Sequence, residues 1–540
     1  MRTLLIILLT SARLGAAQSS PSEQTEPGIA HQRPTGVPYC DNTRGQVELG
    51  SDSMGADMKP YLAGVISRVR SNWTNGMPRD AYPPMRKSGQ VTIELVARQD
   101  GRVDNLRIVQ RSGEPSLDRA AWAGIVASNP FPPLPKDFES PYVSMRFHFC
   151  YNLDPPSADL ADSLRSAAAA LKIGDYTRAI QLYSGLTQTD AVSLDTWEKL
   201  ARAYRLNGMY EKAEATYRRI DFGGSDQLPH YELGRLYAVW NKYDKALPEF
   251  VQAASIMPYD ARLQVDLGTA YLNTGQDDKA LASFDTAVKL WDGPTIWNSI
   301  AYQLALRNSH LDRARQYAES AVSARATALR NVDMATATPH DFWRVGALAS
   351  YWDTLGWVFF ALKDPDTAEK YVSSSWKLRQ LSSSADLLGQ IYEKRGQRDR
   401  AIEAYAWALA GEHAPNSAVS RRLAALLGGE DKVAGEVAKH RDGVLAAQTT
   451  HLDARGPANA DGEFVVMIAS GGGTPTQDAR VVDGDPRLKI LEEPLRTAKF
   501  DITFPPGPPT KIFLHGTVSC SGSGECSFVR SWQVRPEPSN

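Results

Sequence analysis

One group of residues could combine a nucleophile with an acid or base, and it lies near the end of the chain. Its members are Cys520, His515 and Asp501. A cysteine attacks only as its thiolate, so the sulfur must be free. Cys520 and Cys526 enclose the turn-like run Ser-Gly-Ser-Gly-Glu, which favours a disulfide between them. An enzyme with chemistry in this region stays an alternative, and a thiol count under denaturing conditions would decide it.

Sequence motifs for other chemistry are missing. The chain has no Gly-x4-Gly-Lys-Ser/Thr loop, no His-Glu-x-x-His helix and no Gly-x-Ser-x-Gly elbow. The nine histidines are scattered along the chain. We therefore expect no catalytic residue, no cofactor and no metal site, and we look for binding instead.

The N-terminus has the features of a secretory signal. Arg2 precedes the apolar run Leu4 to Leu9, and the small residues Gly15, Ala16 and Ala17 follow. A membrane span needs about 20 apolar residues, so this run is too short for one. We predict a signal peptide over 1–17 and secretion across the inner membrane to the periplasm or envelope, with peripheral rather than spanning membrane association. A retained short anchor stays the alternative.

The net charge limits the possible partners, and the cysteine content predicts disulfides. The net charge of −2 gives no reason to expect a nucleic-acid partner, which calls for a basic excess. Four cysteines in an exported chain suggest two disulfides. If Cys520 pairs with Cys526, then Cys40 is left to pair with Cys150.

Composition and hydrophobic pattern predict a multidomain α+β chain. Beyond the signal we expect a disordered lead-in over 18–56, rich in Ser, Pro, Gln, Thr and Gly. A small α+β domain over 57–152 follows, and then a helical solenoid over 158–425. A linker over 426–461 leads to a β-rich domain over 462–540. That last domain alternates short apolar runs with Pro and Gly, typical of a small sandwich or curled sheet, and we recognise no family for it.

A repeat with a period near 34 residues is the strongest pattern in the chain. Each unit has a small residue, in most units a ring three places on, and an Ala nine places after that position, or ten places in the fifth unit. The small residues are Ala167, Ala201, Gly234, Gly268, Ala301, Gly356 and Gly389, at spacings of 34, 33, 34, 33, 55 and 33. Such a period is typical of a two-helix unit that must stack on its neighbours.

These units resemble tetratricopeptide repeats. The third unit, for example, carries Gly234, Tyr237, Ala246 and Phe250 in the order of that family. The resemblance implies a solenoid of about seven repeats, with these residues used for packing. A partner would instead touch polar positions of the inner helices. The candidates are Asn207, Arg235, Asn273 and Asn298.

The spacing of 55 marks an insertion of about 21 residues near 327–348. Insertions in solenoids map to loops on one face, often the binding face. Phe342 and Trp343 lie outside the repeat pattern there and could anchor a partner segment. The simpler alternative is that the aromatic residues from Trp291 to Trp376 pack within the core.

The stretch 57–152 has its own pattern. An apolar helix face comes first, and two strands follow around Asp100-Gly101, a hairpin turn. A helix begins near Ser116, and a last strand runs from Val143 to Phe149. The segment resembles the C-terminal domain of TonB and TolA-type envelope proteins. The matching runs are Tyr82-Pro83, Gly89-Gln90-Val91, Asp100-Gly101-Arg102-Val103, Ser112-Gly113, Leu117-Asp118, Ala120-Ala121 and Phe131-Pro-Pro-Leu-Pro.

The resemblance implies that a partner peptide is taken up as an added strand. Tyr82 and Pro83 would lie near that surface, and the strand with Val143, Met145 and Phe147 would be the exposed edge. Tyr82-Pro83 could also simply end the first helix. We therefore expect an exported bacterial envelope scaffold that binds envelope proteins or peptides, including outer-membrane receptors. An anchored TonB-type energy transducer is the further alternative.

Overall fold

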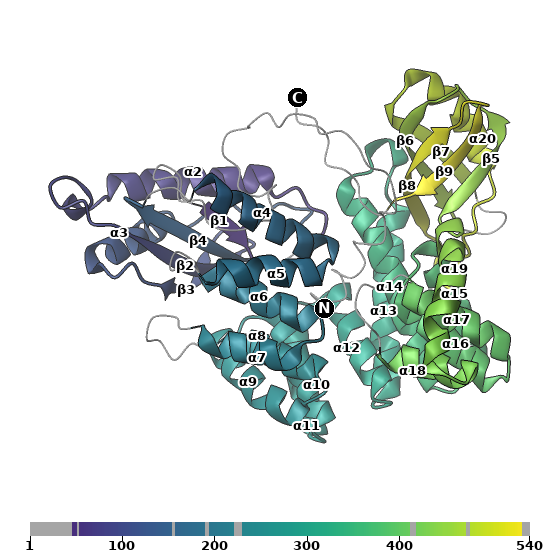
Figure 1. The fold of residues 1–540 in the computed structure, drawn as a ribbon, viewed down its shortest axis with the longest axis horizontal. Helices are drawn as coiled ribbons and strands as arrows, with labels where there is room; N and C mark the ends of the chain where they lie inside the picture. The colour runs from purple at the N-terminus through teal and green to yellow at the C-terminus, as the bar shows by residue number, and fades with distance from the viewer. Residues whose placement is uncertain are drawn as a thin grey trace. The chain divides into compact units, whose positions relative to one another are not determined.

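The computed structural model describes residues 46–50, 53–153, 157–188, 194–220, 229–410, 417–470 and 476–531 (Figure 1). The predicted signal at 1–17 and Cys40 lie outside the described residues, as does most of the expected lead-in. The described residues up to Trp291 form one compact unit, here the N-terminal unit, and those from Asp292 form the C-terminal unit.

The N-terminal unit begins with a four-stranded antiparallel sheet. Its strands are β1 (Gln46–Leu49), β2 (Gly89–Arg98), β3 (Val103–Gln110) and β4 (Tyr142–Tyr151), in the order β1-β4-β2-β3. The predicted hairpin turn connects β2 to β3. Gly101 has a φ of +86°, and a Cβ there would lie 2.0 Å from the backbone oxygen of Phe131, so only glycine fits.

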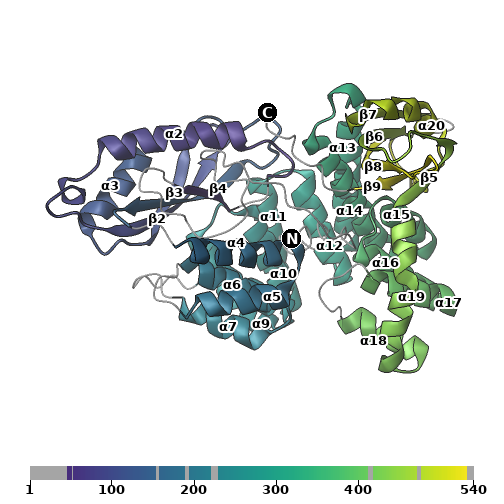
Figure 2. The ribbon, with the colours of Figure 1, turned by 45° about the horizontal axis from the view of Figure 1, so that its top comes forward.

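Two helices cover one face of this sheet, α2 (Lys59–Asn75) and α3 (Pro115–Val126) (Figure 2). The apolar face predicted for α2 is buried and ends at Trp73. The Trp73 indole donates a hydrogen bond to the Tyr151 hydroxyl at 2.6 Å and meets the Phe149 ring edge-on. Gly124 of α3 lets the two helices approach, since a Cβ there would lie 3.1 Å from the Trp73 Cα.

Helix pairs follow, as the repeat pattern predicts. In the N-terminal unit they are α4 (Ala158–Ile173) with α5 (Tyr176–Leu186), α6 (Leu194–Leu206) with α7 (Tyr210–Arg219), α8 (His230–Val239) with α9 (Tyr243–Ile256), and α10 (Ala261–Asn273) with α11 (Asp277–Leu290). The small residues make room for rings, because a Cβ on Gly234 would lie 2.6 Å from the Phe250 ring. These residues are therefore packing residues.

The C-terminal unit continues with α12 (Pro294–Leu306), α13 (Leu311–Arg330), α14 (Pro339–Ala361), α15 (Pro365–Leu378), α16 (Ser382–Lys394), α17 (Arg398–Ala410), α18 (Ser417–Leu427) and α19 (Val433–Ala446). The insertion near 327–348 is mainly helix and not a loop, contrary to our expectation. It lengthens α13 at its end and α14 at its start, so these helices reach 20 and 23 residues.

The extended helices support the β-rich domain. That domain has β5 (Thr449–Arg455), β6 (Asp461–Ala469), β7 (Thr476–Gly484), β8 (Lys511–Cys520) and β9 (Glu525–Arg530), in the order β5-β9-β8-β6-β7. The Thr510 hydroxyl donates to the Ala326 oxygen of α13 at 3.3 Å, and the Lys511 ammonium donates to the Val332 oxygen at 2.7 Å. Arg530 donates to Lys377 at the end of α15 at 2.8 Å. The domain is thus one sheet packed on the repeats.

Two segment predictions differ from the structure. Residues 426–461 were expected to be a linker, yet they hold α19 and β5, and α19 packs on α17. The alternating apolar run Phe500 to Phe504 has the pattern of a further strand, yet it lies outside the strands of the described sheet, and the Ile502 amide donates to the Phe500 oxygen at 2.8 Å. Its residues contact the repeats instead, since the Ser374 and Thr503 hydroxyls lie 3.1 Å apart.

Candidate interaction surfaces

The edge of β4, predicted to accept a partner strand, is closed by the chain itself. β4 lies between β2 and β1, and β1 pairs with it from Gln46 opposite His148 to Leu49 opposite Met145. The Gly50 amide adds a hydrogen bond to the Ser144 oxygen at 2.8 Å. The prediction of an exposed edge at Val143–Phe149 is therefore wrong. β1 is only four residues long, which is too short to give a clear strand signal in the sequence.

The side chains predicted to meet a partner on β4 are core residues. Val143, Met145 and Phe147 are at most 2% exposed, and Phe147 packs against the rings of Phe131 and Phe149. Tyr82 and Pro83, in contrast, are exposed in the segment after a short 3-10 turn at Arg79–Ala81. Their surface role stays a prediction.

The opposite edge of the sheet is also protected. Two residues of β3 face one of β2 near Asn105, which has a positive φ of 52°. The Val103 amide donates to the Asn129 side chain at 3.1 Å. A bulge and a used amide both hinder addition of another strand. In the domain that resembles TonB, the TonB-like domain below, the two edges of the described sheet are therefore the four-residue strand β1 and the bulged strand β3, and β4 is not an edge.

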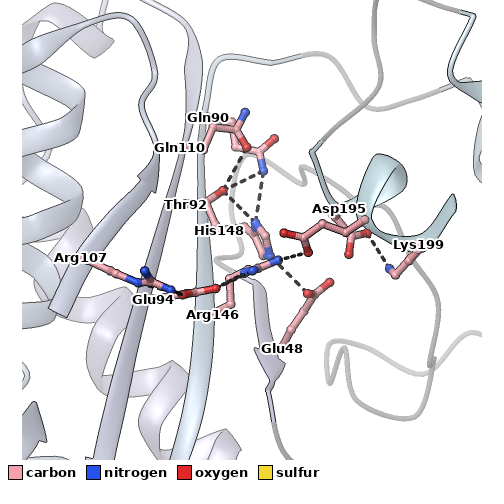
Figure 3. A network of polar contacts seen from close by, with 11 residues as sticks. Glu48, Gln90, Thr92, Glu94, Arg107, Gln110, Arg146, His148, Asp195 and Lys199 are labelled. Atoms are coloured by element: carbon pink, nitrogen blue, oxygen red, sulfur yellow. Dashed lines mark hydrogen bonds and ion pairs between the residues drawn. The ribbon is translucent and has the colours of Figure 1, made fainter. Parts of the chain in front are cut away.

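The polar face of the sheet carries a partly buried ion network (Figure 3). Side chains alternate along a strand, so Thr92, Glu94, Arg146 and His148 share the face opposite α2 and α3. Arg146 donates to Glu94 at 2.9 Å from its Nε and to Glu198 of α6 at 3.0 Å from its Nη1. The sheet is therefore joined to the second repeat of the N-terminal unit, which contains α6.

The electrostatics of this network follow from burial and pairing. Burial favours the neutral form of Glu94, but the charges of Arg146 and Arg107 outweigh it and lower its pKa to about 2. Burial would also raise the pKa of Glu48, yet its interaction with His148, 3.8 Å away, lowers it to about 2. Burial raises the pKa of Glu198 despite its contact with Arg146. A network of this kind fixes one arrangement of sheet and repeat.

A second set of contacts joins the sheet to the loop between α9 and α10. The Tyr142 hydroxyl donates to Asp260 at 3.0 Å, and its ring meets Tyr259 edge-on at 5.8 Å. The Asn105 side chain donates to the Ile256 oxygen at 3.0 Å. The TonB-like domain is therefore held at two places by the repeats of its own unit.

The four polar repeat residues predicted to touch a partner are mostly used within the chain. Arg235 is 7% exposed and lies beside Glu232, and the Asn273 amide donates to the Thr269 oxygen. Asn207 is partly buried just beyond the end of α6. Asn298 is 7% exposed, and its Oδ1 has no hydrogen-bond partner among the described residues. Of the four, Asn298 has a buried polar atom without a hydrogen-bond partner among the described residues.

The two aromatic residues of the insertion also have partners within the chain. The Phe342 ring meets Phe513 and His515 of β8 edge-on, with centroids 6.4 and 5.8 Å apart. Trp343 stacks on His340 and lies under the Arg325 guanidinium. Both are partly buried, so these contacts support the packing interpretation. An additional partner at this place stays a prediction.

Comparison of the repeats reveals residues that our sequence analysis did not select. We define the inner face of a repeat by two positions of its first helix, three residues before and one after the small residue. These positions are four apart and share one side of a helix. In the C-terminal unit the inner face carries Asn298 with Tyr302, Asp353 with Trp357, and Asp386 with Gln390. Aligning the repeats at these positions could have found them.

Asp353 stands out on this face. It is 4% exposed and accepts a hydrogen bond from the Ser384 hydroxyl at 2.7 Å. No lysine or arginine of the described segments forms an ion pair with it, and burial raises its pKa to about 6. Asp386 does pair, with Arg422 of α18 at 2.6 Å. The Tyr302 and Trp357 rings lie edge-to-face at 6.5 Å beside these carboxylates.

The catalytic alternative near the C-terminus is not supported. Cys520 and Cys526 form a disulfide, as predicted, so neither is a thiolate. His515 and Cys520 are five residues apart on one strand, which places them about 17 Å apart and on opposite faces. Asp501 pairs with Lys377 at 2.7 Å. The described residues also hold no cluster of three or more side chains suited to a metal ion.

The other cysteine prediction is partly outside the described residues. Cys150 is disulfide-bonded, while Cys40 lies in a segment that is not described. The pairing of the two stays a prediction. Among the described helices, none is both long and apolar enough to cross a membrane.

Comparison with known proteins agrees with both resemblances. Residues 58–149 match the TonB C-terminal family, and residues 164–227, 241–290 and 384–418 match tetratricopeptide repeat families. The chain therefore combines a TonB-type C-terminal domain with tetratricopeptide repeats. Modules of these two kinds define a protein-interaction scaffold.

Individual relatives are distant. BBSome complex member BBS4 of Bos taurus is 23% identical over 167 residues, which is 31% of each chain, so this chain spans about a third of that relative. A tetratricopeptide repeat protein from Parabacteroides merdae is 12% identical with a TM-score of 0.38, over 50% of this chain and 98% of that one. The Pseudomonas aeruginosa protein pilF is 17% identical with a TM-score of 0.26, over 40% and 90%.

Proposed function

We propose that this chain is an exported scaffold of the bacterial envelope, in which the TonB-like domain is a fixed brace and the repeats bind the protein partners. The TonB-type domain, the signal-like N-terminus and the disulfides support an envelope location. Its partners would be envelope proteins, including those of outer-membrane transport.

The main support for this proposal is that the edge of β4 and the polar face of the TonB-like sheet are both covered by other parts of the same unit. β1 fills the edge of β4, and the polar face is joined to α6 through Arg146 and Glu198. A domain that is held in this way contributes stability and orientation. The energy-coupling alternative depends on strand addition at that edge, so the closed edge argues against it.

The repeats provide the remaining binding surface. The inner face of the C-terminal unit carries buried and partly buried aromatic and polar groups. Its Asn298 oxygen and Trp357 indole nitrogen are buried and lack hydrogen-bond partners among the described residues. The β-rich domain contacts α13, α15, and α14 at its start and at Trp352. Its described contacts therefore leave the inner positions of α12, α14 and α16 to a partner.

Site-specific photocrosslinking in the source bacterium would test this proposal. The photoreactive residue would replace Gln390 on the inner face, Tyr82 on the TonB-like domain, or Lys279 on α11 as a control site. We expect a protein crosslink from position 390 and none from the control. Crosslinks from position 82 alone would return the partner to the TonB-like domain, and crosslinks from none of the three would contradict a scaffold.

The location needs its own measurement. Cell fractionation with N-terminal sequencing of the mature chain should give a periplasmic or envelope protein that begins near Gln18. A chain that keeps Met1 and stays with the inner membrane would restore the anchored alternative.

A further inference from the structure

The N-terminal unit shows what a carboxylate on the inner face of a repeat can bind. Glu198 lies three residues before the small residue Ala201, and it accepts a hydrogen bond from the Arg146 guanidinium at 3.0 Å. Arg146 belongs to a strand of a different domain of the unit. One repeat of this chain therefore already binds an arginine that an extended segment presents to it.

The same repeat position carries carboxylates again in the C-terminal unit. Asp353 lies three residues before Gly356, and Asp386 three residues before Gly389. Asp386 is paired with Arg422. Asp353 is only 4% exposed, yet no cation of the described residues pairs with it. The arrangement repeats the acceptor of the N-terminal unit without its arginine.

The neighbouring groups suit a basic side chain on a peptide. Tyr302 and Trp357 lie one helical turn after Asn298 and Asp353, and their rings are 6.5 Å apart. Aromatic rings next to carboxylates can contact both the stem and the charge of arginine or lysine. The Asn298 oxygen and the Trp357 indole nitrogen are buried without a hydrogen-bond partner among the described residues, so each would gain a bond from a ligand group that reaches it.

The cost of burying the charged Asp353 carboxylate supports a binding role for this residue. A buried carboxylate without a cation destabilises the folded state at neutral pH, and its pKa near 6 reflects that penalty. Strained or costly groups of this kind are common at functional sites. A bound cation would remove the penalty.

We propose that the inner face of the C-terminal repeats binds an extended segment of a partner protein through an arginine or lysine, whose charge lies at Asp353 and Asp386 and whose stem packs on Tyr302 and Trp357. This inference rests on the proposed scaffold function and adds the chemistry of the partner.

A titration of the full chain with a defined peptide would test it. The probe is acetyl-Ser-Tyr-Arg-Phe-Ser-amide, and its control has neutral citrulline in place of arginine. The readout is the indole N–H resonance of Trp357 in chain labelled with ¹⁵N-tryptophan, assigned by its loss in Trp357→Phe. We expect a saturable shift with the arginine peptide and binding at least about 10-fold weaker with citrulline.

Three variants make the test specific. Asp353→Asn keeps an oxygen that accepts the hydrogen bond from Ser384, so this variant should fold. Its affinity for the arginine peptide should nevertheless be about 10-fold lower or more. Asp386→Asn should weaken it as well, while Asp399→Asn on the exposed side of α17 should not. Equal binding of both peptides, or unchanged binding by Asp353→Asn, would overturn the proposal.

Two further outcomes separate this proposal from the scaffold function. If the arginine peptide does not bind while position 390 still crosslinks to a protein, the scaffold function is supported and the proposal of a basic segment is wrong. If the Trp357 resonance moves on dilution of the chain without peptide, a second copy of the chain occupies this face, and a separate partner is contradicted.

Discussion

At the scale of single residues, the charges of Arg146 and Asp353 have contrasting surroundings. In the N-terminal unit Arg146 lies between Glu94 and Glu198, so its charge is compensated on two sides. In the C-terminal unit Asp353 is buried with hydroxyl partners. Compensated charges fix a structure, whereas an uncompensated one leaves binding energy for a ligand.

Removal of Arg146 should destabilise the N-terminal unit. Arg146→Met leaves the partly buried Glu198 without its cation, and the loss of a hydrogen bond to a charged group costs about 1–3 kcal/mol. Hydrogen exchange of β4 and α6, followed by mass spectrometry, should rise accordingly. Arg102→Met is the control, since that arginine is 77% exposed and its pair with Asp100 contributes little. Equal exchange in both variants would contradict the structural role of the network.

Replacement of Asp353 should have the opposite effect. Its folded pKa of about 6 lies above the ordinary value of 3.8, so the ionised group reduces stability above pH 6, and stability rises as pH falls from 6 towards 4. Asp353→Asn should therefore stabilise the C-terminal unit by up to about 3 kcal/mol at pH 7.5 and change it little at pH 4. Calorimetry at both pH values would show this, with Asp399→Asn as the control. A variant less stable at pH 7.5 would contradict the argument.

At the scale of elements, β1 decides what the TonB-like domain can do. It has four residues, and Val47 within it is 1% exposed opposite Phe147. A proline at this position removes an amide and disturbs the pairing. Val47→Pro should raise hydrogen exchange of the outer β4 amides by on the order of 10-fold or more, while β2 stays protected.

The control for this variant is Val47→Ile, which keeps strand propensity and the amide. Exchange in β4 that is the same in both variants would mean that β1 does not protect the edge. If Val47→Pro newly gains crosslinks at the TonB-like domain, the edge is competent for strand addition once β1 leaves it.

The lengthened helices α13 and α14 are the second decisive elements. Phe342→Ala should loosen the β-rich domain by about 1–3 kcal/mol, because it removes the ring contacts with Phe513 and His515. Hydrogen exchange in β8 would report the change. Leu306→Ala, at a residue 45% exposed on α12, should leave β8 unchanged. Unchanged β8 exchange in Phe342→Ala would return this residue to the candidates for partner binding.

At the scale of the whole molecule, the repeats and the TonB-like domain could be predicted because their patterns are local and periodic. Gly234 with Phe250 is one such pair, and the Asp100-Gly101 turn is one such signal. Pairings between distant segments could not be predicted. Gln46–Leu49 is too short to show a period, and its partner β4 lies about 100 residues further on. Glu94 and Arg146 look like solvated strand positions until Glu198 is placed beside them.

The disulfides give the last prediction, which concerns the compartment in which the molecule folds. Cys520 and Cys526 lie opposite each other at the ends of β8 and β9, and Cys150 of the N-terminal unit is also disulfide-bonded. Chain purified from the envelope should therefore show no free thiol under denaturing, non-reducing conditions. Closing a loop of this length stabilises a hairpin by about 2 kcal/mol in the chain-entropy account. Cys520→Ser/Cys526→Ser should thus melt the β-rich domain at lower temperature, with Ser521→Ala as the control. Four reactive thiols in native protein would instead indicate a reducing compartment and contradict export.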